Sequence, residues 1–227
     1  MHQPVAILAH GMGRTPFSMA LLAYRLRRQG FRTAVFGYSV TVEKFPSCLA
    51  RLQRFIQSRC AGQPYIVVGH SLGAVLLRCV LPKLSQLPVA CFFLASPAQV
   101  CGFARLLAPS VPYRLVAGEM GQLLADETFM QSVPIPRCPT WIYAGTGGPT
   151  SRFYPLGDEP NDGILKVSET RLPGVPVVLV PAMHTFMMNS RRVVQHLLQH
   201  AHAAVAATLH PVASPSAPVA YTDYKSN

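Results

Sequence analysis

Acidic side chains are scarce in this sequence. Nine Asp and Glu residues stand against 20 Lys and Arg residues, so the formal net charge at pH 7 is +11. A basic surface can bind nucleic acid, attract anionic lipid headgroups or keep a protein in solution. Nothing in the chain resembles a nucleic-acid motif with stacking aromatic side chains, so we expect no nucleic-acid partner. Peripheral contact with an anionic membrane surface stays open.

Paired cysteine motifs and long hydrophobic runs are also missing. None of the six cysteines belongs to a C-x-x-C pair, so we predict that they are buried free thiols. The longest uncharged apolar stretch, residues 87–104, is interrupted by Pro88, Pro97 and Gly102 and is expected to hold a buried strand, with no membrane-spanning helix. No basic segment with a cleavage site precedes the first predicted strand, so we expect a cytoplasmic protein.

Short apolar segments alternate with helical patterns along the chain. The predicted strands are residues 5–9, 33–38, 65–69, 89–95, 140–144 and 175–180, and the predicted helices are residues 17–29, 46–59, 72–81 and 191–207. Apolar strands that alternate with helices indicate a parallel sheet covered on both faces. We therefore predict one α/β domain over residues 1–210, with about six mostly parallel strands. Residues 211–227, which are rich in Ala, Ser and Pro, are predicted to be a flexible tail.

A serine flanked by glycines follows the third predicted strand. Residues 69–73 read Gly-His-Ser-Leu-Gly and fit the pattern G-x-S-x-G of a nucleophile elbow. Glycine on either side removes the Cβ atoms that would crowd such a strained turn between strand and helix. Ser71 is therefore a candidate nucleophile, and the amide of Leu72, at a helix N-terminus, is a candidate oxyanion donor. The alternative is an ordinary glycine-rich turn of a parallel-sheet protein.

The loop after the first predicted strand offers a second oxyanion donor. Residues 10–13 read His-Gly-Met-Gly, and a histidine-glycine turn at this place often supplies a backbone amide to the reacting carbonyl. The donor here would be the amide of Met12. The two glycines would allow the loop to approach the substrate closely.

A serine nucleophile needs a base, and the chain has eight histidines. His184 follows the last predicted strand, at the end of a parallel sheet where ligands bind. Three others, His196, His200 and His202, fall in the last predicted helix, while the remaining four lie near the termini, in the elbow or beside the first loop. His184 is therefore the candidate general base.

The residue that orients this histidine is expected to be a carboxylate between the serine and the histidine. Only seven acidic residues lie in that interval: Glu119, Asp126, Glu127, Asp158, Glu159, Asp162 and Glu169. Asp162 is the preferred candidate because Asn161-Asp162-Gly163 lies in the expected loop between the last two strands. Asp158 and Glu159 share that loop and stay as alternatives.

These motifs, in this order and each after a strand, resemble the α/β-hydrolase superfamily, and within it the bacterial triacylglycerol lipases and lipase-like esterases. The resemblance covers residues 5 to about 200. It implies a minimal α/β-hydrolase fold with Ser71 as nucleophile, His184 as base and Asp162 as orienting acid. The amides of Met12 and Leu72 would form the oxyanion hole, and no metal or organic cofactor is needed.

Residues 97–139 are too long for a plain crossover and contain helix-like pieces at 103–107 and 121–130. Because insertions at this position commonly cap the active site in the resembling family, we expect a small lid; the alternative is an extended crossover helix with loops. Six apolar side chains of this segment would line an acyl pocket or belong to the crossover's own core: Phe103, Leu106, Leu107, Leu123, Leu124 and Phe129.

The resemblance implies a serine hydrolase that cleaves a carboxylic ester with an apolar acyl chain, either a small molecule or a lipid. A thioesterase or an acyltransferase with the same triad is one alternative. A non-catalytic protein of the same fold that binds a hydrophobic ligand is the other.

Overall fold

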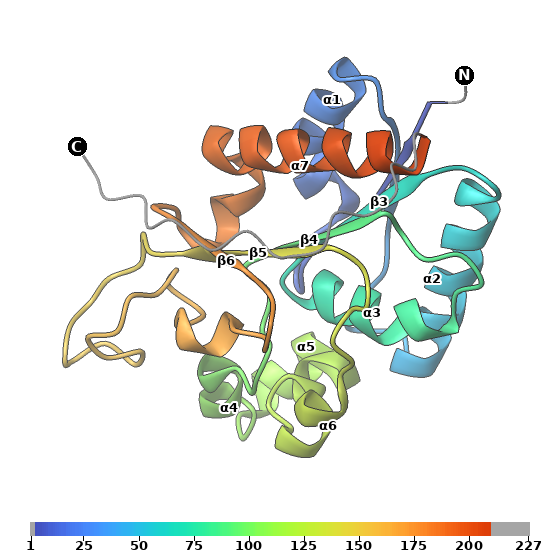
Figure 1. Ribbon diagram of the computed structural model, residues 1–227. Coiled ribbons are helices and arrows are strands. Elements are labelled where there is room, and N and C mark those ends of the chain that lie inside the picture. The colour runs from blue at the N-terminus through green and yellow to red at the C-terminus, as the bar shows by residue number, and fades with distance from the viewer. Residues whose placement is uncertain (1–2, 210–227) are drawn as a thin grey trace, which may run out of the picture.

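The computed structural model describes residues 3–209 and is built around one sheet of six parallel strands (Figure 1). The strands are β1 (Val5–Ala9), β2 (Arg32–Phe36), β3 (Tyr65–His70), β4 (Ala90–Leu94), β5 (Thr140–Gly145) and β6 (Val177–Val180), in the spatial order β2-β1-β3-β4-β5-β6. This arrangement confirms the predicted α/β fold. The predicted tail, residues 211–227, lies outside the described residues.

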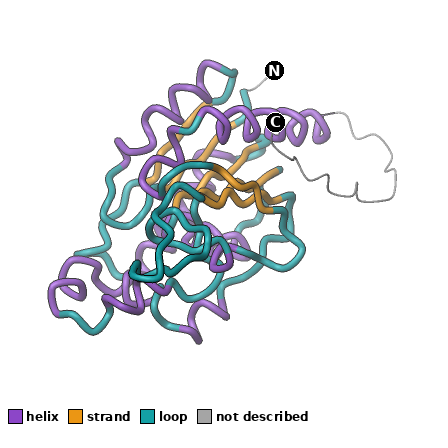
Figure 2. The backbone as a smooth tube through the Cα atoms, turned by 90° about the vertical axis from the view of Figure 1, so that its left-hand side faces the viewer, coloured by secondary structure: helices purple, strands orange, loops and turns teal. Residues whose placement is uncertain are grey.

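Helices cover both faces of the sheet, as the apolar strands predicted. In Figure 1, α1 (Ala20–Arg28) and α7 (Arg191–Leu209) lie above the sheet, and α2 (Phe45–Cys60) and α3 (Leu72–Val80) lie below it. The side view shows the same strands between two sets of helices (Figure 2). Along β1, Val5, Ile7 and Ala9 belong to the core shared with α2 and α3, whereas Ala6 and Leu8 belong to the core shared with α1 and α7. The alternation of side chains along a strand thus supplies both cores.

Several element boundaries differ from those predicted. The first helical segment begins as a 3-10 turn, Pro16–Met19, before α1 starts at Ala20. β2 ends at Phe36, two residues earlier than expected, and Gly37 passes so close to Pro16 that a Cβ atom there would lie 2.8 Å from its ring. β6 begins at Val177 because Pro176 has no N–H to give to a sheet.

The segment between β4 and β5 holds three helices on the α3 side of the sheet (Figure 1). They are α4 (Gly102–Leu107), α5 (Val111–Leu123) and α6 (Glu127–Ser132). α5 is broken at Gly118, whose φ of 57° and ψ of −159° are not helical. A Cβ atom at Gly118 would collide with the carbonyl oxygen of Val40, so this close approach requires glycine. The sequence pattern indicated the position of α4. The predicted piece 121–130 was wrong as one helix, since it covers only the last three residues of α5 and continues through the break at 124–126 into α6.

A buried arginine holds both ends of this segment. Arg78, on α3, is 1% exposed, and its guanidinium donates to the carbonyl oxygens of Pro97 (3.2 Å), Val133 (2.9 Å) and Pro134 (3.0 Å). Burial lowers the pKa of Arg78 to about 10, so the side chain stays charged at neutral pH. The carbonyl dipoles compensate a buried charge that has no carboxylate partner among the described residues.

The cysteines are free thiols, as predicted. Four of them are buried, whereas Cys79 and Cys138 are partly exposed. Cys91, on β4, and Cys138, before β5, place their Sγ atoms 3.3 Å apart without a bond between them.

Substitution of the buried arginine tests the anchoring of the inserted segment. We expect Arg78→Met to lower the free energy of unfolding by about 3 kcal/mol, because it leaves three buried carbonyl groups without a donor. The measurement is urea denaturation followed by circular dichroism. Arg54→Met, at an exposed position on α2, is the matched control. Equal effects of the two variants would show that the three hydrogen bonds do not stabilise the fold.

Candidate active site

Ser71 occupies a strained turn between β3 and α3. Its backbone has φ 51° and ψ −122°, and Ser71 and Ala95 are the non-glycine residues with positive φ in the part of the chain described. Its amide donates to the carbonyl oxygen of Leu94 on β4 (2.9 Å), so hydrogen bonding to the sheet holds the turn. Such a turn lifts a serine side chain above the carboxyl end of the sheet.

The glycines that flank this turn are required by close backbone contacts. A Cβ atom at Gly69 would lie 2.5 Å from the Cα atom of Ala74. A Cβ atom at Gly73 would collide with the carbonyl oxygens of Ala9 and His10, which end β1 and begin the next loop. Because Gly73 has no side chain, the first turn of α3 packs directly on the loop that carries Met12.

Asp162 and His184 form a buried hydrogen-bonded pair. His184 Nδ1 and Asp162 Oδ2 are 2.8 Å apart, and the amide of His184 donates to the carbonyl oxygen of Asp162 (2.8 Å). The other carboxylate oxygen, Oδ1, accepts from the amides of Ile164 (2.9 Å) and Leu165 (2.7 Å). Asp162 is 1% exposed, and these donors compensate its burial. Its hydrogen bond to Nδ1 leaves Nε2 as the free nitrogen of the His184 ring.

The two alternative carboxylates lie elsewhere. Asp158 is exposed, and Glu159 accepts a hydrogen bond from the amide of Ser168 (2.9 Å). That bond lowers the pKa of Glu159, against the opposing effect of burial. Neither carboxylate forms a hydrogen bond with His184 among the described residues.

Ser71 and His184 line the same pocket, although no hydrogen bond joins their side chains within residues 3–209. Both are nearly buried, with relative exposures of 9% and 8%. Catalytic hydrogen bonds are often long in a site without substrate and tighten when substrate binds. The serine and the paired imidazole therefore both border the same pocket.

The rest of the pocket is mainly apolar. Its cavity volume is about 170 Å³. Apolar side chains from the first loop, from α4, from the residue after α5 and from the segment after Asp162 line it: Met12, Phe103, Ala104, Leu107, Leu124, Ile164 and Leu165. Three of the six side chains proposed for an acyl pocket are in this set. Leu106 is exposed instead, Leu123 does not line the pocket, and Phe129 packs edge-on against Phe45 at 5.2 Å between ring centres.

The loop after β1 carries Met12, whose side chain lines the pocket. The carbonyl oxygen of Gly11 accepts from His10 Nδ1 (2.9 Å) and from the amide of Arg14 (3.3 Å). In a trans peptide the N–H points away from the carbonyl, so these bonds turn the Met12 amide in the opposite direction. Neither the Met12 nor the Leu72 amide has an acceptor within the described chain.

Two neutral histidines support the site, and the sequence analysis did not assign a role to either. His10 stacks on Tyr38 with ring centres 4.4 Å apart, and burial lowers its pKa. His70 Nε2 donates to the carbonyl oxygen of His184 (3.0 Å), and burial lowers the pKa of His70 well below its usual value. The elbow is therefore tied directly to the backbone of the loop that carries His184.

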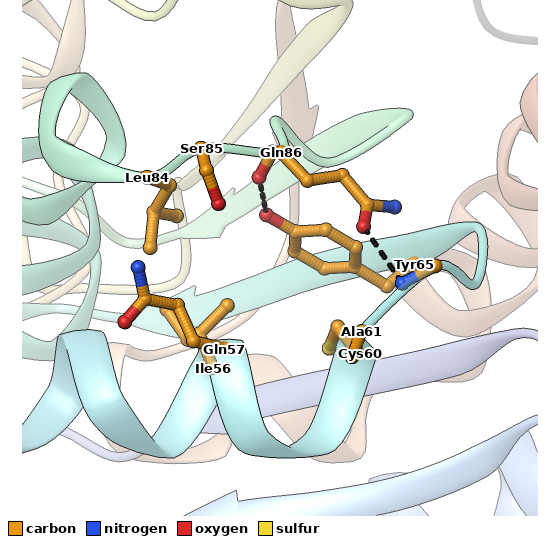
Figure 3. A pocket seen from close by; sticks show the side chains of 9 residues that line it. Ile56, Gln57, Cys60, Ala61, Tyr65, Leu84, Ser85 and Gln86 are labelled. Atoms are coloured by element: carbon orange, nitrogen blue, oxygen red, sulfur yellow. Dashed lines mark hydrogen bonds between the residues drawn. The ribbon is translucent and has the colours of Figure 1, made fainter.

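A second cavity lies at the opposite end of β3. It has a volume of about 260 Å³ and lies between α2, Tyr65 and residues 84–86 (Figure 3). Tyr65 is the first residue of β3, whereas Ser71 follows the last. The Tyr65 hydroxyl donates to the carbonyl oxygen of Gln86, and the Gln86 side chain accepts from the amide of Gly62 (3.2 Å). These polar groups pair with one another, and none of the predicted site residues lines this cavity.

Metal-binding clusters and membrane-spanning helices are not found in residues 3–209. No group of three or more His, Cys, Asp or Glu side chains is placed to hold a metal ion there. Likewise, no helix in this range combines the length and the apolar character needed to cross a bilayer.

The sequence profile of the alpha/beta hydrolase family matches residues 6–221. The chain belongs to this family. The match covers nearly all of the chain and agrees with the six parallel strands and with the strained turn at Ser71. The sequence itself matches no curated protein at a significant level.

Solved structures of this alpha/beta hydrolase fold are similar to the chain at low sequence identity. Bacillus licheniformis lipase BlEst2 in mature form is 15% identical with a TM-score of 0.64, over 88% of this chain and 92% of that one. The metagenomic carboxyl esterase MGS0156 is 16% identical with a TM-score of 0.66, over 92% and 76% of the two chains. The RedJ thioesterase of the prodiginine pathway in Streptomyces coelicolor is 15% identical with a TM-score of 0.56, over 89% and 86%. These likenesses show a common fold.

Substitution of Gly73 tests the close contact between α3 and the loop after β1. We expect Gly73→Ala to lower the free energy of unfolding by more than about 3 kcal/mol, because backbone atoms surround the added methyl group. Gly157→Ala is the control: Gly157 has positive φ, at 69°, which Gly73 has not, and nothing lies within 4 Å of an added Cβ atom there, so it adds backbone strain without a collision. The control is expected to cost about 1 kcal/mol. Thermal and urea unfolding measure both, and a Gly73 variant as stable as the control would contradict the packing described.

Proposed function

We propose that this alpha/beta hydrolase is a serine hydrolase that cleaves a carboxylic ester with an apolar acyl chain. The observation that carries the proposal is that a strained serine and an imidazole paired with a buried carboxylate line one apolar pocket. A protein that only binds a hydrophobic ligand needs neither the strained backbone at Ser71 nor the buried pair of Asp162 and His184. The proposal therefore favours an enzyme over a binding protein.

In the proposed reaction, His184 accepts the hydroxyl proton of Ser71 as Ser71 Oγ bonds to the acyl carbon. The carbon–oxygen bond to the alcohol then breaks, and His184 gives the proton to the departing oxygen. Water, deprotonated by His184, then attacks the acyl carbon. The bond from that carbon to Ser71 Oγ breaks, His184 returns the proton to Oγ, and the acid leaves. Asp162 holds the imidazole in the required tautomer and stabilises its cation.

Two backbone amides are proposed to stabilise the tetrahedral intermediate. The hydrogen bonds on the Gly11 carbonyl fix the orientation of the peptide to which the Met12 amide belongs, and the Leu72 amide begins α3. Donors that are already oriented cost no reorganisation when negative charge develops on the carbonyl oxygen. The lack of an internal acceptor for either amide supports this role.

A thioesterase is the second candidate. The same acyl-enzyme can form from a thioester, and the chain shares its fold with the RedJ thioesterase. The apolar wall formed by α4 and α5 fits the acyl group in either case.

Covalent labelling and substitution of the proposed triad test the mechanism. A fluorophosphonate probe is expected to label Ser71 in the folded protein, as peptide mapping would detect. Ser71→Ala and His184→Ala should each lower kcat on activated esters by several orders of magnitude. Asp162→Asn should lower kcat by about 10⁴-fold, because it favours the wrong histidine tautomer.

Glu159→Gln is the matched control for the carboxylate. It removes a charge from the same loop, but the Glu159 side chain accepts a hydrogen bond from the amide of Ser168 and none from His184. We therefore expect kcat to change less than about threefold. Absence of label from Ser71 would refute the serine mechanism. A larger loss of kcat in Glu159→Gln than in Asp162→Asn would instead refute the choice of acid.

Narrowing of the pocket tests the position of the acyl chain. Ala104 lines the pocket from α4, whereas Leu106 on the same helix is exposed. We expect Ala104→Leu to lower kcat/KM for p-nitrophenyl dodecanoate at least about tenfold relative to the butanoate, because the added side chain fills the space for the longer acid. Leu106→Ala should leave this ratio unchanged. A chain-length profile that is the same in both variants would place the acyl group elsewhere.

A further inference from the structure

One formally charged side chain, Arg14, lines the pocket that holds Ser71 and His184. The other described lining residues include no Asp, Glu or Lys. Burial keeps His70 neutral, as its lowered pKa indicates. A ligand in the pocket therefore meets a single fixed positive charge beside an apolar wall.

The guanidinium of Arg14 makes only one hydrogen bond within the described chain. Its one hydrogen bond runs from Nη2 to the carbonyl oxygen of Thr185 and is long, at 3.4 Å. It forms no ion pair, since the two pairs within residues 3–209 join Arg51 to Glu43 and His184 to Asp162. A guanidinium has five N–H donors in a planar fork that matches phosphate and carboxylate. By contrast, the buried guanidinium of Arg78 donates to three carbonyl oxygens.

Arg14 lies on the same side of the pocket as His184. Arg14 ends the turn that carries Met12, and its hydrogen-bond acceptor, Thr185, directly follows His184. Apart from Met12, the apolar side chains that line the pocket come from other elements, namely α4, the end of α5 and residues 164–165. Because His184 must reach the departing oxygen to protonate it, the leaving group lies on the side of His184 and hence of Arg14.

We propose that Arg14 selects substrates whose leaving alcohol carries a negatively charged phosphate within a few bonds of the scissile oxygen, as in an acylated glycerol phosphate. This inference rests on the proposed serine hydrolase function and adds its substrate class. The apolar acyl chain would lie against α4 and α5, and the phosphate would accept hydrogen bonds from the Arg14 fork. The phosphate ester itself stays intact, and the alcohol leaves with its phosphate.

The experiment compares two substrates that differ only in this phosphate: 1-octanoylglycerol and 1-octanoylglycerol 3-phosphate, both kept below the concentration at which they aggregate. The wild-type protein is expected to show the higher kcat/KM on the phosphate ester. Arg14→Gln should lower the ratio of the two kcat/KM values by about tenfold or more, because a charge-assisted fork is lost. Arg14→Lys, which keeps the charge without the fork, should give an intermediate ratio.

Arg54→Gln is the matched control for net charge, since it removes one exposed arginine from α2. Its ratio should equal that of the wild type. Measurements in about 0.5 M NaCl, where the Debye length is about 4 Å, suppress general attraction by the net charge of +11, and the effect of Arg14→Gln should persist there.

Three outcomes would overturn the assignment of Arg14: a wild-type protein without preference for the phosphate ester, equal losses on both esters in Arg14→Gln, or turnover of neither ester. Fluorophosphonate labelling of Ser71, measured on the same samples, separates these outcomes from failure of the proposed function. Label on Ser71 together with one of them refutes the phosphate recognition alone. Absence of label refutes the serine mechanism itself.

Discussion

The site depends on the contact between the first turn of α3 and the end of β1. Gly73 lies against the carbonyl oxygens of Ala9 and His10 with no room for a side chain. This contact puts the strained turn at Ser71 beside the loop that carries Met12. Ala9, at the end of β1, is paired with Gly69 near the end of β3. This parallel register fixes the position of the loop after β1 along the strand direction relative to the turn at Ser71. A shift of either element would separate the serine from the amide of Met12.

Few of the buried charged groups in residues 3–209 are paired with a carboxylate. Asp162 is the one buried acidic residue in the described chain, and its two carboxylate oxygens receive two backbone amides and the ring of His184. Where the fold buries a cation, at Arg78, backbone carbonyls take the place of an acid. No Asp or Glu lines the pocket, and Arg14 is the one formally charged side chain in its described lining.

The segment between β4 and β5 gives the pocket its apolar character. α4 contributes Phe103, Ala104 and Leu107 to the lining, and Leu124 directly follows α5. The segment is held at its ends by Arg78 and in its middle by the contact between Gly118 and Val40. In the proposed reaction, chemistry and substrate shape thus come from different parts of the chain: the ends of the strands carry the proposed reacting groups, and the insertion supplies the apolar lining proposed for the acyl chain.

Local patterns were sufficient for the elements and for the order of the motifs. The apolar runs placed all six strands within a few residues, because a strand buried on both faces must be apolar throughout. The pattern of Gly69, Ser71 and Gly73 predicted the strained turn, although the contact that requires glycine at position 73 is with Ala9 and His10, far away in the chain. The same reasoning did not detect the first half of α5 or the break at Gly118, because these depend on contact with residues 40–41.

The sequence by itself determined the fold class, the family and a short set of candidate site residues, because these follow from periodicity and local backbone constraints. Only the tertiary structure decided that Asp162, and neither Asp158 nor Glu159, bonds to His184, since all three share one loop and differ only in where it folds. The tertiary structure also decided the hydrogen bond from His70 to the carbonyl oxygen of His184 and the position of the Arg14 guanidinium, which makes one long hydrogen bond to Thr185. Each depends on groups more than 20 residues apart in the chain, and the packing of the sheet alone brings such groups together.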